Sequence, residues 1–279
     1  MLPSESVRQR NERIFQCASP VVMVTGSAAP RVGRCVAETF ASQDFRVVLH
    51  SHRTDNDSQR DSQQALDELT SAGHQAMLVT GPVEDEHRVA SWVDQVVKNF
   101  GRVDVLVNSA AIWDPCNLED ARAEDYERNF RINVLGTALC GQHFGLAMAK
   151  QPSGGAIINI GDWAVARPYR NFAPYLISKG SIENWTHTLA VELAHRNPQV
   201  RVNAVLPGPI QLAEGITAER RAKIIQASLL KREGTADDLA QAALFLATSP
   251  FITGVCLPVD GGRSIWSGEN SDVNAHPDC

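Results

Sequence analysis

Residues 21–33 read VVMVTGSAAPRVG, a short apolar run followed by a loop of small residues. The apolar run predicts a buried strand, and the loop leads into a helical pattern near residues 33–43. A strand-to-helix turn of this kind lets free backbone N–H groups approach a phosphate. In this interpretation Gly26 permits the tight turn and Gly33 permits close packing of the helix. The alternative is an ordinary turn, because two glycines alone are a weak signal.

The alternation of apolar strand and amphipathic helix continues along the chain. Strands are predicted at residues 21–25, 46–50, 76–79, 103–108, 156–160, 200–206 and 255–259. Helices are predicted near residues 33–43, 57–72, 86–99, 123–149, 172–195 and 217–247. Strands that are almost entirely Val, Ile and Leu are typical of a parallel sheet covered on both faces. We therefore predict one α/β domain, doubly wound, with a mainly parallel seven-stranded sheet.

The predicted domain spans residues 19–266, a length that suits a single large core. Residues 1–18 are polar and lack a clear periodicity, which predicts an N-terminal extension with a short helical turn at most. Residues 267–279 are also polar and predict a flexible tail. Neither an internal repeat nor a linker interrupts the domain.

Composition narrows the class of partner. The chain has 279 residues and a formal net charge of -6, which argues against nucleic acid or an anionic membrane as the main partner. No apolar run approaches the roughly 20 residues that span a bilayer, and no signal peptide is evident. The six cysteines include no Cys-x-x-Cys pair, which argues against a zinc site or a disulfide framework. We expect a cytoplasmic protein that acts on a small molecule and binds no metal.

The segment after the second predicted strand bears on the choice of cofactor. Residues 51–54 read SHRT, and no acid precedes Asp55. Enzymes that bind NAD normally place an acid here to contact the ribose 2′-hydroxyl, and that acid would repel a 2′-phosphate. The basic residues of this segment, together with Arg31 in the glycine loop, can instead bind a phosphate. This pattern predicts NADP(H), and the alternative is that the segment forms a solvated turn.

Tyr175 and Lys179 are the candidate catalytic pair. Their separation of four residues in a predicted helix places them on one face, one turn apart. A phenol exchanges protons poorly at neutral pH unless a nearby cation stabilises the phenolate, and Lys179 supplies that cation. Asp162 ends a buried strand thirteen residues before the tyrosine, so the three side chains can converge. A Tyr-x-x-x-Lys pattern alone is common by chance. Here it follows a predicted nucleotide-binding loop and an apolar strand, and this position favours a catalytic role.

These motifs together make the chain resemble the short-chain dehydrogenase/reductase family, from about residue 21 to residue 265. The motifs are Thr25-Gly26 with Gly33, Asn108-Ser109-Ala110-Ala111, Asn133, Tyr175-x-x-x-Lys179, Pro207-Gly208 and Asp260-Gly261-Gly262. The resemblance implies a Rossmann fold and a nicotinamide cofactor. The expected cofactor-binding residues are Gly26, Arg31, Val32, Gly33, Ser51, His52, Arg53, Thr54, Asn108, Ser109, Ala110, Tyr175, Lys179, Pro207, Gly208 and Ile210.

The same resemblance implies individual roles. Asn133 is expected to hold a water in the proton relay, and Lys179 to contact the nicotinamide ribose as well as Tyr175. The residues from Asn108 to Ala111 are expected to line the adenosine side. The backbone from Pro207 to Ile210 is expected to meet the nicotinamide carboxamide. The family also implies a homotetramer, built on the helices near residues 123–149 and 172–195.

Asp162 departs from the family pattern, which usually has a serine at this position. An ionised carboxylate only accepts hydrogen bonds and repels a developing oxyanion, so it suits a substrate that is itself a donor. Asp162, Tyr175 and Lys179 at this spacing resemble the pteridine reductase subgroup. Trp113, five residues after Asn108, stands where that subgroup has an aromatic residue that holds the pterin against the nicotinamide. Asp162, Tyr175 and Trp113 are thus the candidate substrate-binding residues.

Simpler interpretations of two of these residues stay open. Trp113 can be a loop residue that closes the core, and Asp162 can be a helix N-cap that tolerates the lost serine. We therefore carry three hypotheses. The first is NADPH-dependent reduction of a pterin or dihydropterin ring. The second is a general carbonyl reductase or alcohol dehydrogenase of the 3-oxoacyl or sugar type, and the third is a catalytically silent protein that senses NADP(H).

Overall fold

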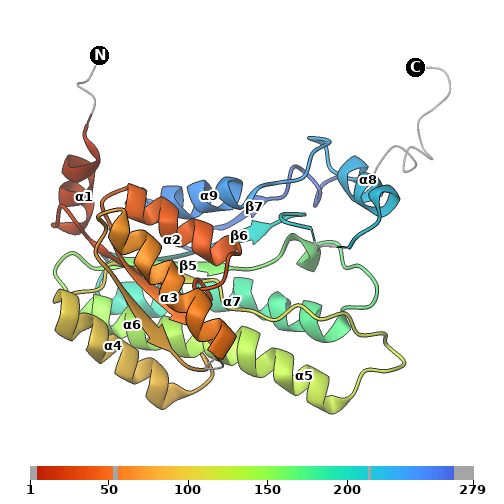
Figure 1. The fold of residues 1–279 in the computed structure, drawn as a ribbon, viewed down its shortest axis with the longest axis horizontal. Helices are drawn as coiled ribbons and strands as arrows, with labels where there is room; N and C mark the ends of the chain where they lie inside the picture. Colours follow the sequence, from red (N-terminus) through yellow and green to blue (C-terminus); the bar gives the residue numbers. More distant parts are fainter. Residues whose placement is uncertain (1–4, 53–55, 213–214, 267–279) are drawn as a thin grey trace.

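The computed structural model describes residues 5–52, 56–212 and 215–266. At its centre is a seven-stranded, all-parallel sheet with the order β3-β2-β1-β4-β5-β6-β7 (Figure 1). The strands are β1 (Val21–Val24), β2 (Arg46–Ser51), β3 (Ala76–Thr80), β4 (Val105–Asn108), β5 (Gly155–Ile160), β6 (Val200–Pro207) and β7 (Cys256–Val259). From β1 the strands are added toward one edge of the sheet as far as β3, and from β4 onward they are added toward the other edge. This change of direction opens a crevice at the carboxyl ends of β1 and β4. The predicted doubly wound parallel sheet is confirmed.

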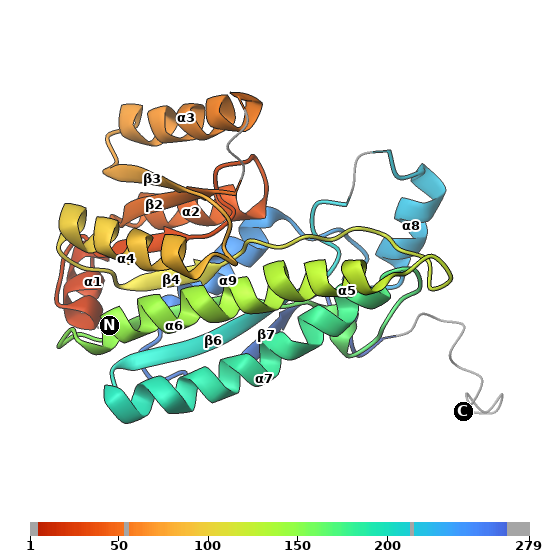
Figure 2. The same cartoon turned by 90° about the horizontal axis from the view of Figure 1, so that it is seen from below.

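Helices cover both faces of this sheet, as Figures 1 and 2 show from two directions. The α-helices are α1 (Val7–Phe15), α2 (Val32–Ser42), α3 (Asn56–Ser71), α4 (Glu86–Phe100), α5 (Ala123–Asn129), α6 (Gly136–Ala149), α7 (Ala173–Arg196), α8 (Ala218–Gln226) and α9 (Ala236–Thr248). A π-helix, η1 (Phe130–Leu135), joins α5 to α6, and a 3₁₀-helix, η2 (Trp163–Val165), follows β5. Helices α2 and α9 lie on one face, and α4, α6 and α7 lie on the other.

Each face of the sheet has its own apolar core, and β1 contributes side chains to both cores. Val22 and Val24 pack with side chains of α2 and α9, whereas Val21 and Met23 pack with side chains of α4, α6 and α7. Alternate residues of a strand point to opposite faces, so a strand buried on both sides must be apolar throughout. This explains why the strand at residues 21–24 shows no alternation of polar and apolar residues in the sequence.

The helix predicted near residues 217–247 is divided in two. Helix α8 ends at Gln226, and Lys231 in the connection to α9 has a left-handed φ of 50°. Thr235 then begins α9 through a capping box with Asp238, in which each side chain bonds the other residue's backbone N–H. The periodicity runs across this break because both helices carry apolar residues at helical spacing.

The N-terminal segment is more ordered than its polar composition suggests. Ser6 caps α1 through a capping box with Gln9, and Phe15 at the end of α1 is 1% exposed within the core beside α2. The amide of the buried Asn11 donates to the backbone carbonyls of Ala18 and Gln43. Helix α1 thus packs on the domain rather than extending away from it. The predicted tail at residues 267–279 lies outside the described residues.

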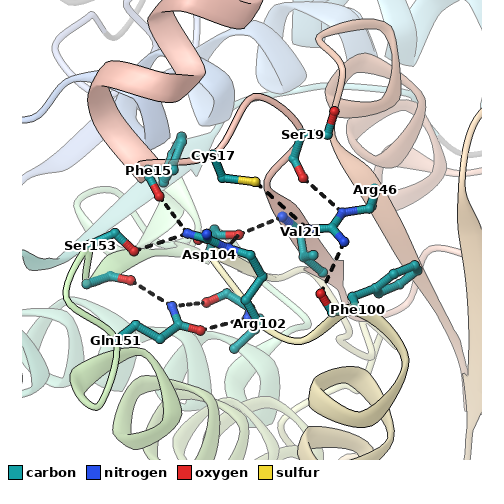
Figure 3. A network of polar contacts seen from close by, with 12 residues as sticks. Phe15, Cys17, Ser19, Val21, Arg46, Phe100, Arg102, Asp104, Gln151 and Ser153 are labelled. Atoms are coloured by element: carbon teal, nitrogen blue, oxygen red, sulfur yellow. Dashed lines mark hydrogen bonds and ion pairs between the residues drawn. The ribbon is translucent and has the colours of Figure 1, made fainter.

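A polar network ties α1 to the amino ends of the central strands, opposite the crevice (Figure 3). Arg102 makes a two-pronged ion pair with Asp104, with N···O distances of 2.6 Å from Nη2 and 2.9 Å from Nε. The same guanidinium donates to the Phe15 carbonyl at 2.6 Å, and the Asp104 carboxylate accepts the Val21 N–H at 2.8 Å. One ion pair therefore connects the end of α1, the start of β1 and the segment before β4.

Candidate active site

The glycine loop after β1 has the backbone geometry that its sequence predicts. Gly26 has a left-handed φ of 67°, and a Cβ added there would lie 2.9 Å from Ala110 Cα. A Cβ at Gly33 would lie 2.6 Å from the Gly26 carbonyl oxygen, so the first turn of α2 packs directly on the loop. The two glycines are required by the close approach of three backbone segments. The loop sits at the crevice between β1 and β4.

Buried side chains hold this loop in place from two sides. His50, at the end of β2, accepts the Gly26 N–H at Nδ1 and contacts the Gly81 carbonyl through Nε2, each at 2.9 Å. Burial lowers the pKa of His50 to about 4, so the ring is neutral and Nε2 carries the proton. On the other side, Arg34 donates to the carbonyls of Ser27 and Ala28. His50 is therefore a structural brace rather than part of a phosphate-binding segment.

The other residues predicted to hold the cofactor phosphates lie around the loop. Arg31 is exposed and precedes α2, whose first turn has no side-chain cap. Val32 and Gly33 form that first turn. Ser51 is buried at the end of β2, and His52 beside it is exposed. Arg53 and Thr54 lie outside the described residues.

The carboxyl end of β4 is fixed by buried hydrogen bonds. Thr25 Oγ1 accepts the N–H groups of Ser109 and Ala110 at 2.9 and 3.0 Å, which joins β4 to the glycine loop. The Asn108 amide donates to Asn159 Oδ1 on β5 at 2.9 Å. The Asn108 Oδ1 atom is buried and has no hydrogen-bond partner among the described residues. An unpaired buried acceptor at this edge is a site where a bound ligand can donate.

The segment after β6 packs against the segment after β7. A Cβ at Gly208 would lie 2.5 Å from Asp260 Cα, so only glycine fits beside the Pro207 end of β6. The Asp260 carboxylate accepts the N–H groups of Gly262 and Ser264, which fixes that turn. Ile210 forms a bridge to Gly234, just before α9. The predicted residues Pro207, Gly208 and Ile210 thus form a rigid edge near the carboxyl end of β6.

The structure brings Asp162, Tyr175 and Lys179 together, as the spacing predicts. Asp162 follows β5, and the other two lie one turn apart at the start of α7. The Tyr175 hydroxyl donates to Asp162 Oδ2 at 2.5 Å, and Asp162 Oδ1 accepts the Ala164 N–H at 2.8 Å. Lys179 Nζ donates to the Ile160 carbonyl at 2.7 Å. The aspartate is therefore both the cap of η2 and the partner of the phenol.

The electrostatics of this trio favour a protonated phenol. Burial and the adjacent Asp162 carboxylate raise the pKa of Tyr175 well above its ordinary value. Burial also raises the pKa of Asp162, although the hydrogen bond from Tyr175 opposes this. Burial lowers the pKa of Lys179 to about 8, against the attraction of Asp162. Without a bound ligand, Tyr175 is thus a proton donor directed at a carboxylate, rather than a phenolate stabilised by the lysine.

Asn133 lies behind the trio in the π-helix η1. Its amide donates to Ser178 Oγ at 3.0 Å and to the Ile112 carbonyl at 3.2 Å, and its Oδ1 accepts the Ile112 N–H at 2.9 Å. Ser178 follows Tyr175 by three residues, so this contact joins η1 to the first turns of α7. A single π-helical turn often marks a functional site, because it turns side chains away from the regular helical face.

A row of aromatic rings extends from Tyr175 along the loop before α7. Trp113 is stacked on Phe172 with ring centroids 4.8 Å apart, and its Nε1 donates to the Tyr169 hydroxyl at 2.9 Å. Phe172 contacts Tyr175 edge to face, with centroids 6.4 Å apart. Trp113 is 49% exposed, so it does not close the core. Its ring is held by Phe172 and Tyr169, and Phe172 connects it to the ring of Tyr175.

Comparison with known proteins identifies the family. The family model described as enoyl-(acyl carrier protein) reductase matches residues 27–264. A cis-4-hydroxycyclohexanecarboxylate dehydrogenase of Sinomonas cyclohexanicum is 33% identical over 250 residues, which cover 88% of this chain and 96% of the relative. A short chain dehydrogenase/reductase of Aspergillus oryzae is 29% identical over 266 residues, covering 91% and 98%. The chain belongs to the short-chain dehydrogenase/reductase family.

A solved structure supports the same placement. The blue fluorescent protein from a metagenomic library, in complex with NADPH, superposes with a TM-score of 0.78 at 29% sequence identity, covering 88% of this chain and 97% of that protein. This short-chain dehydrogenase/reductase is accordingly an oxidoreductase that uses a nicotinamide cofactor. In the part of the chain that the structure describes, no helix is long and apolar enough to cross a membrane. No cluster of His, Cys, Asp or Glu in those residues could hold a metal ion.

The residues at the crevice fit a nicotinamide dinucleotide. Gly26 and Gly33 let the backbone segments of the loop pack closely, and α2 begins without a side-chain cap. Both features suit an anionic diphosphate at a helix N-terminus. The unpaired Asn108 Oδ1 offers an acceptor at the neighbouring strand end. When bound, the cofactor supplies or accepts a hydride.

Sequence reasoning missed several residues of this site. Phe172 and Trp163 belong to the aromatic row, and His50 holds the glycine loop. The signal available for the rings was the density of aromatic residues between Asp162 and Tyr175. No sequence signal could assign His50, because a histidine at a strand end looks the same whether it faces the solvent or a neighbouring loop.

Proposed function

We propose that the protein is an NADPH-dependent reductase that transfers a hydride to a pterin or dihydropterin ring, with Tyr175 as the proton donor. The observation that carries this proposal is the 2.5 Å hydrogen bond from the Tyr175 hydroxyl to Asp162 Oδ2. A carboxylate at this position repels the oxyanion that grows when a ketone is reduced. A ring nitrogen that bears a hydrogen can instead donate to Asp162, because an ionised carboxylate only accepts.

The protonation states support reduction as the working direction. Reduction of a C=N bond adds a hydride to the carbon and a proton to the nitrogen. Tyr175 holds its proton, because burial and Asp162 raise its pKa. The phenol can give that proton to the ring nitrogen, and the Asp162 carboxylate keeps the ring oriented through an N–H group. Lys179 lies one turn away on α7 and adds a positive charge near the phenolate that remains.

Trp113 supports a flat substrate. Stacking on Phe172 and the hydrogen bond to Tyr169 fix its ring, so binding a planar molecule against it costs little conformational entropy. Such stacking contributes about 0.5–1.5 kcal/mol beyond the burial of area. Phe172 connects this fixed ring to Tyr175, so a planar substrate stacked on Trp113 would be oriented relative to the proton donor.

The choice of NADP(H) over NAD(H) belongs to the same proposal. The exposed Arg31 and His52 flank the crevice near the end of β2, and no acid occupies the end of that strand. A blue fluorescent protein of similar fold is described in complex with NADPH. We expect the 2′-phosphate to bind among Arg31, His52 and the neighbouring Arg53.

The test follows the oxidation of NADPH, and separately of NADH, with dihydrobiopterin and with a panel of ketones. We expect dihydrobiopterin to be reduced with NADPH, and Asp162→Ser to lower its turnover about 100-fold, as for loss of proton-transfer catalysis. Asp162→Asn is the matched variant, because its amide oxygen can still cap η2 at Ala164 but cannot act as a carboxylate. Both variants should spare or raise ketone reduction.

Each other outcome selects a different hypothesis. Unchanged pterin turnover in Asp162→Asn would remove the role given to Asp162. Faster reduction of ketones than of pterins by the wild-type protein would favour a general carbonyl reductase or alcohol dehydrogenase. Tight NADPH binding without turnover of any substrate would favour the cofactor-sensing protein.

We also propose that the protein is a homotetramer. Large apolar side chains stand exposed on η1, α6 and α7, the elements that the family resemblance assigns to subunit contacts. They are Phe130, Leu135, Leu146, Ile177 and Val191. Exposed apolar residues that gather on neighbouring helices mark an interaction surface more often than isolated ones do.

A further inference from the structure

Arg167 and Arg263 are both half-buried and lie near Trp163, at the end of the aromatic row that is farthest from Tyr175. The row passes from Tyr175 to Phe172, from Phe172 to Tyr169 at 5.1 Å, and from Tyr169 to Trp163 at 6.4 Å between ring centroids. The Arg263 guanidinium carbon then lies 4.8 Å from the centroid of the Trp163 ring. A chain of ring contacts therefore connects the proposed proton donor to a cation.

Arg167 holds Arg263 in this place. Its guanidinium donates to the Arg263 carbonyl at 2.9 Å and also to the Trp266 carbonyl. The Arg263 side chain in turn donates to the Ile224 carbonyl on α8. Three segments meet at this point, which are the loop after β5, the turn after β7 and helix α8. Guanidinium groups fixed by several segments are preorganised to bind a planar anion.

Neither arginine has an acidic partner among the described residues. No carboxylate there lies within ion-pair distance of Arg167 or Arg263, whereas eight other arginines of the same residues form ion pairs. The partners of both side chains are neutral carbonyls. The nearby Asp260 carboxylate accepts two backbone N–H groups of its own turn. Burial lowers the pKa of Arg263 and repulsion by Arg167 lowers it further, whereas attraction by Asp260 partly opposes this. An anion bound here would relieve that repulsion.

We propose that Arg263, positioned by Arg167, binds a carboxylate carried by the substrate. The inference deepens the proposed function, on which it rests for the ring at Tyr175. A flat ring placed against the aromatic row would have its reacting end at Tyr175 and Asp162. An acidic substituent at its other end would then meet Arg263 above Trp163. The substrate class is thereby narrowed to planar rings that bear a carboxylate, and Arg263 is the specificity-determining residue.

The test compares pairs of ligands that share one ring and carry either an acidic or a neutral substituent. Pterin-6-carboxylate and 6-hydroxymethylpterin form one pair, and 2-naphthoate and 2-naphthamide form a second pair that needs no pterin ring. Their dissociation constants are measured by isothermal titration calorimetry with NADP⁺ present, which requires no turnover. The variants are Arg263→Gln, which keeps donors but loses the charge, and Arg263→Lys, which keeps the charge. Arg170→Met is the control, because Arg170 is an exposed arginine of the same loop.

We expect Arg263→Gln to weaken binding of the acidic member of a pair about tenfold, the usual effect of losing a charge-assisted hydrogen bond. The neutral member should change less than about twofold, and Arg263→Lys should recover part of the loss. Arg170→Met should bind both members as the wild type does. Equal weakening of both members in Arg263→Gln would mean that Arg263 only holds α8 and the loop together, and would overturn the inference.

The second pair separates this inference from the proposed function. Should neither pterin bind while naphthoate is preferred over naphthamide through Arg263, the pterin proposal fails and the carboxylate site stands. Should pterins bind and react without any preference for the acid, the pterin proposal stands and the carboxylate site fails. Absence of a charge preference in both pairs overturns the carboxylate site whatever the outcome with pterins.

Discussion

Asp162 shows how one side chain can serve local folding and chemistry together. Its Oδ1 caps η2 through the Ala164 N–H, and its Oδ2 accepts the Tyr175 hydroxyl. The two interpretations that the sequence left open, a helix cap and a catalytic group, are thus compatible. The cap fixes the carboxylate rotamer, and a fixed carboxylate can hold the phenol proton in one direction. A serine would have to accept both hydrogen bonds at a single, uncharged oxygen.

At the residue scale, His50 predicts how the stability of the protein depends on pH. Burial lowers its pKa from 6.5 to about 4, so the unfolded chain binds a proton more readily than the folded one. Stability from this group is therefore full above pH 6.5 and is lost as the pH falls toward 4. Protonation would also remove the Nδ1 acceptor of the Gly26 N–H. From pH 7 to pH 5 we expect His50 alone to lower the free energy of unfolding by about 2 kcal/mol.

Chemical denaturation at both pH values measures this effect. His50→Gln offers an acceptor and a donor but does not titrate, so its loss of stability between pH 7 and pH 5 should be smaller than that of the wild type by about 2 kcal/mol. At pH 7 the variant should be less stable than the wild type, because the amide does not fill the space of the ring. The same pH dependence in both proteins would show that His50 does not carry the acid sensitivity.

At the scale of the element, the limits of prediction follow from what each signal contains. The spacing of Tyr175 and Lys179 depends only on the rise of a regular helix, so the sequence predicted their juxtaposition and the structure confirms it. The π-helical turn around Asn133 depends on packing against Ile112 and Ser178, which lie far away in the chain, and no local pattern encodes it. The burial of Phe15 could not be predicted either, because one apolar residue at the end of a polar helix does not indicate packing against the core.

The Arg102–Asp104 ion pair gives the prediction at this scale. The Asp104 side chain is fully buried, with 0% exposure, and Arg102 is its cationic partner. Arg102→Met would leave an unpaired buried carboxylate and release the end of α1, so we expect a loss of about 3–5 kcal/mol in the free energy of unfolding. The exposed pair Arg196–Glu192 is the control, and Arg196→Met should cost less than about 1 kcal/mol.

A second substitution distinguishes charge from packing. Asp104→Asn in the Arg102→Met background removes the buried charge while keeping an acceptor for the Val21 N–H, so it should restore part of the stability. Denaturant titration measures all four proteins. If the double variant is no more stable than Arg102→Met, the loss arises from the missing contacts of the guanidinium rather than from the unpaired carboxylate.

At the scale of the whole molecule, the chemistry and the anchoring occupy opposite ends of the same strands. The carboxyl ends carry the glycine loop, the catalytic trio and the aromatic row, whereas the amino ends carry the Arg102 network (Figure 3). The sequence predicted this division as far as the parallel sheet dictates it, because every strand of such a sheet ends at the same edge. Contacts between loops, such as Arg263 with Trp163, depend on the paths of those loops and could not be predicted from the spacing of residues in the sequence.

The proposed tetramer gives the last prediction. Ile177 and Val191 are 55% and 72% exposed on α7, and their separation of fourteen residues is close to four helical turns, so they share a face. Leu135 and Leu146, 44% and 38% exposed, lie on η1 and α6 and are eleven residues apart, which is about three helical turns. A tetramer that buries this surface cannot accept a charge in it, so Val191→Asp should give a smaller species in size-exclusion chromatography with light scattering. Val97→Asp on α4 should keep the mass of the wild type, because α4 lies outside this surface. A wild-type mass equal to one chain would overturn the tetramer, and a tetramer that survives Val191→Asp would place the subunit contact elsewhere.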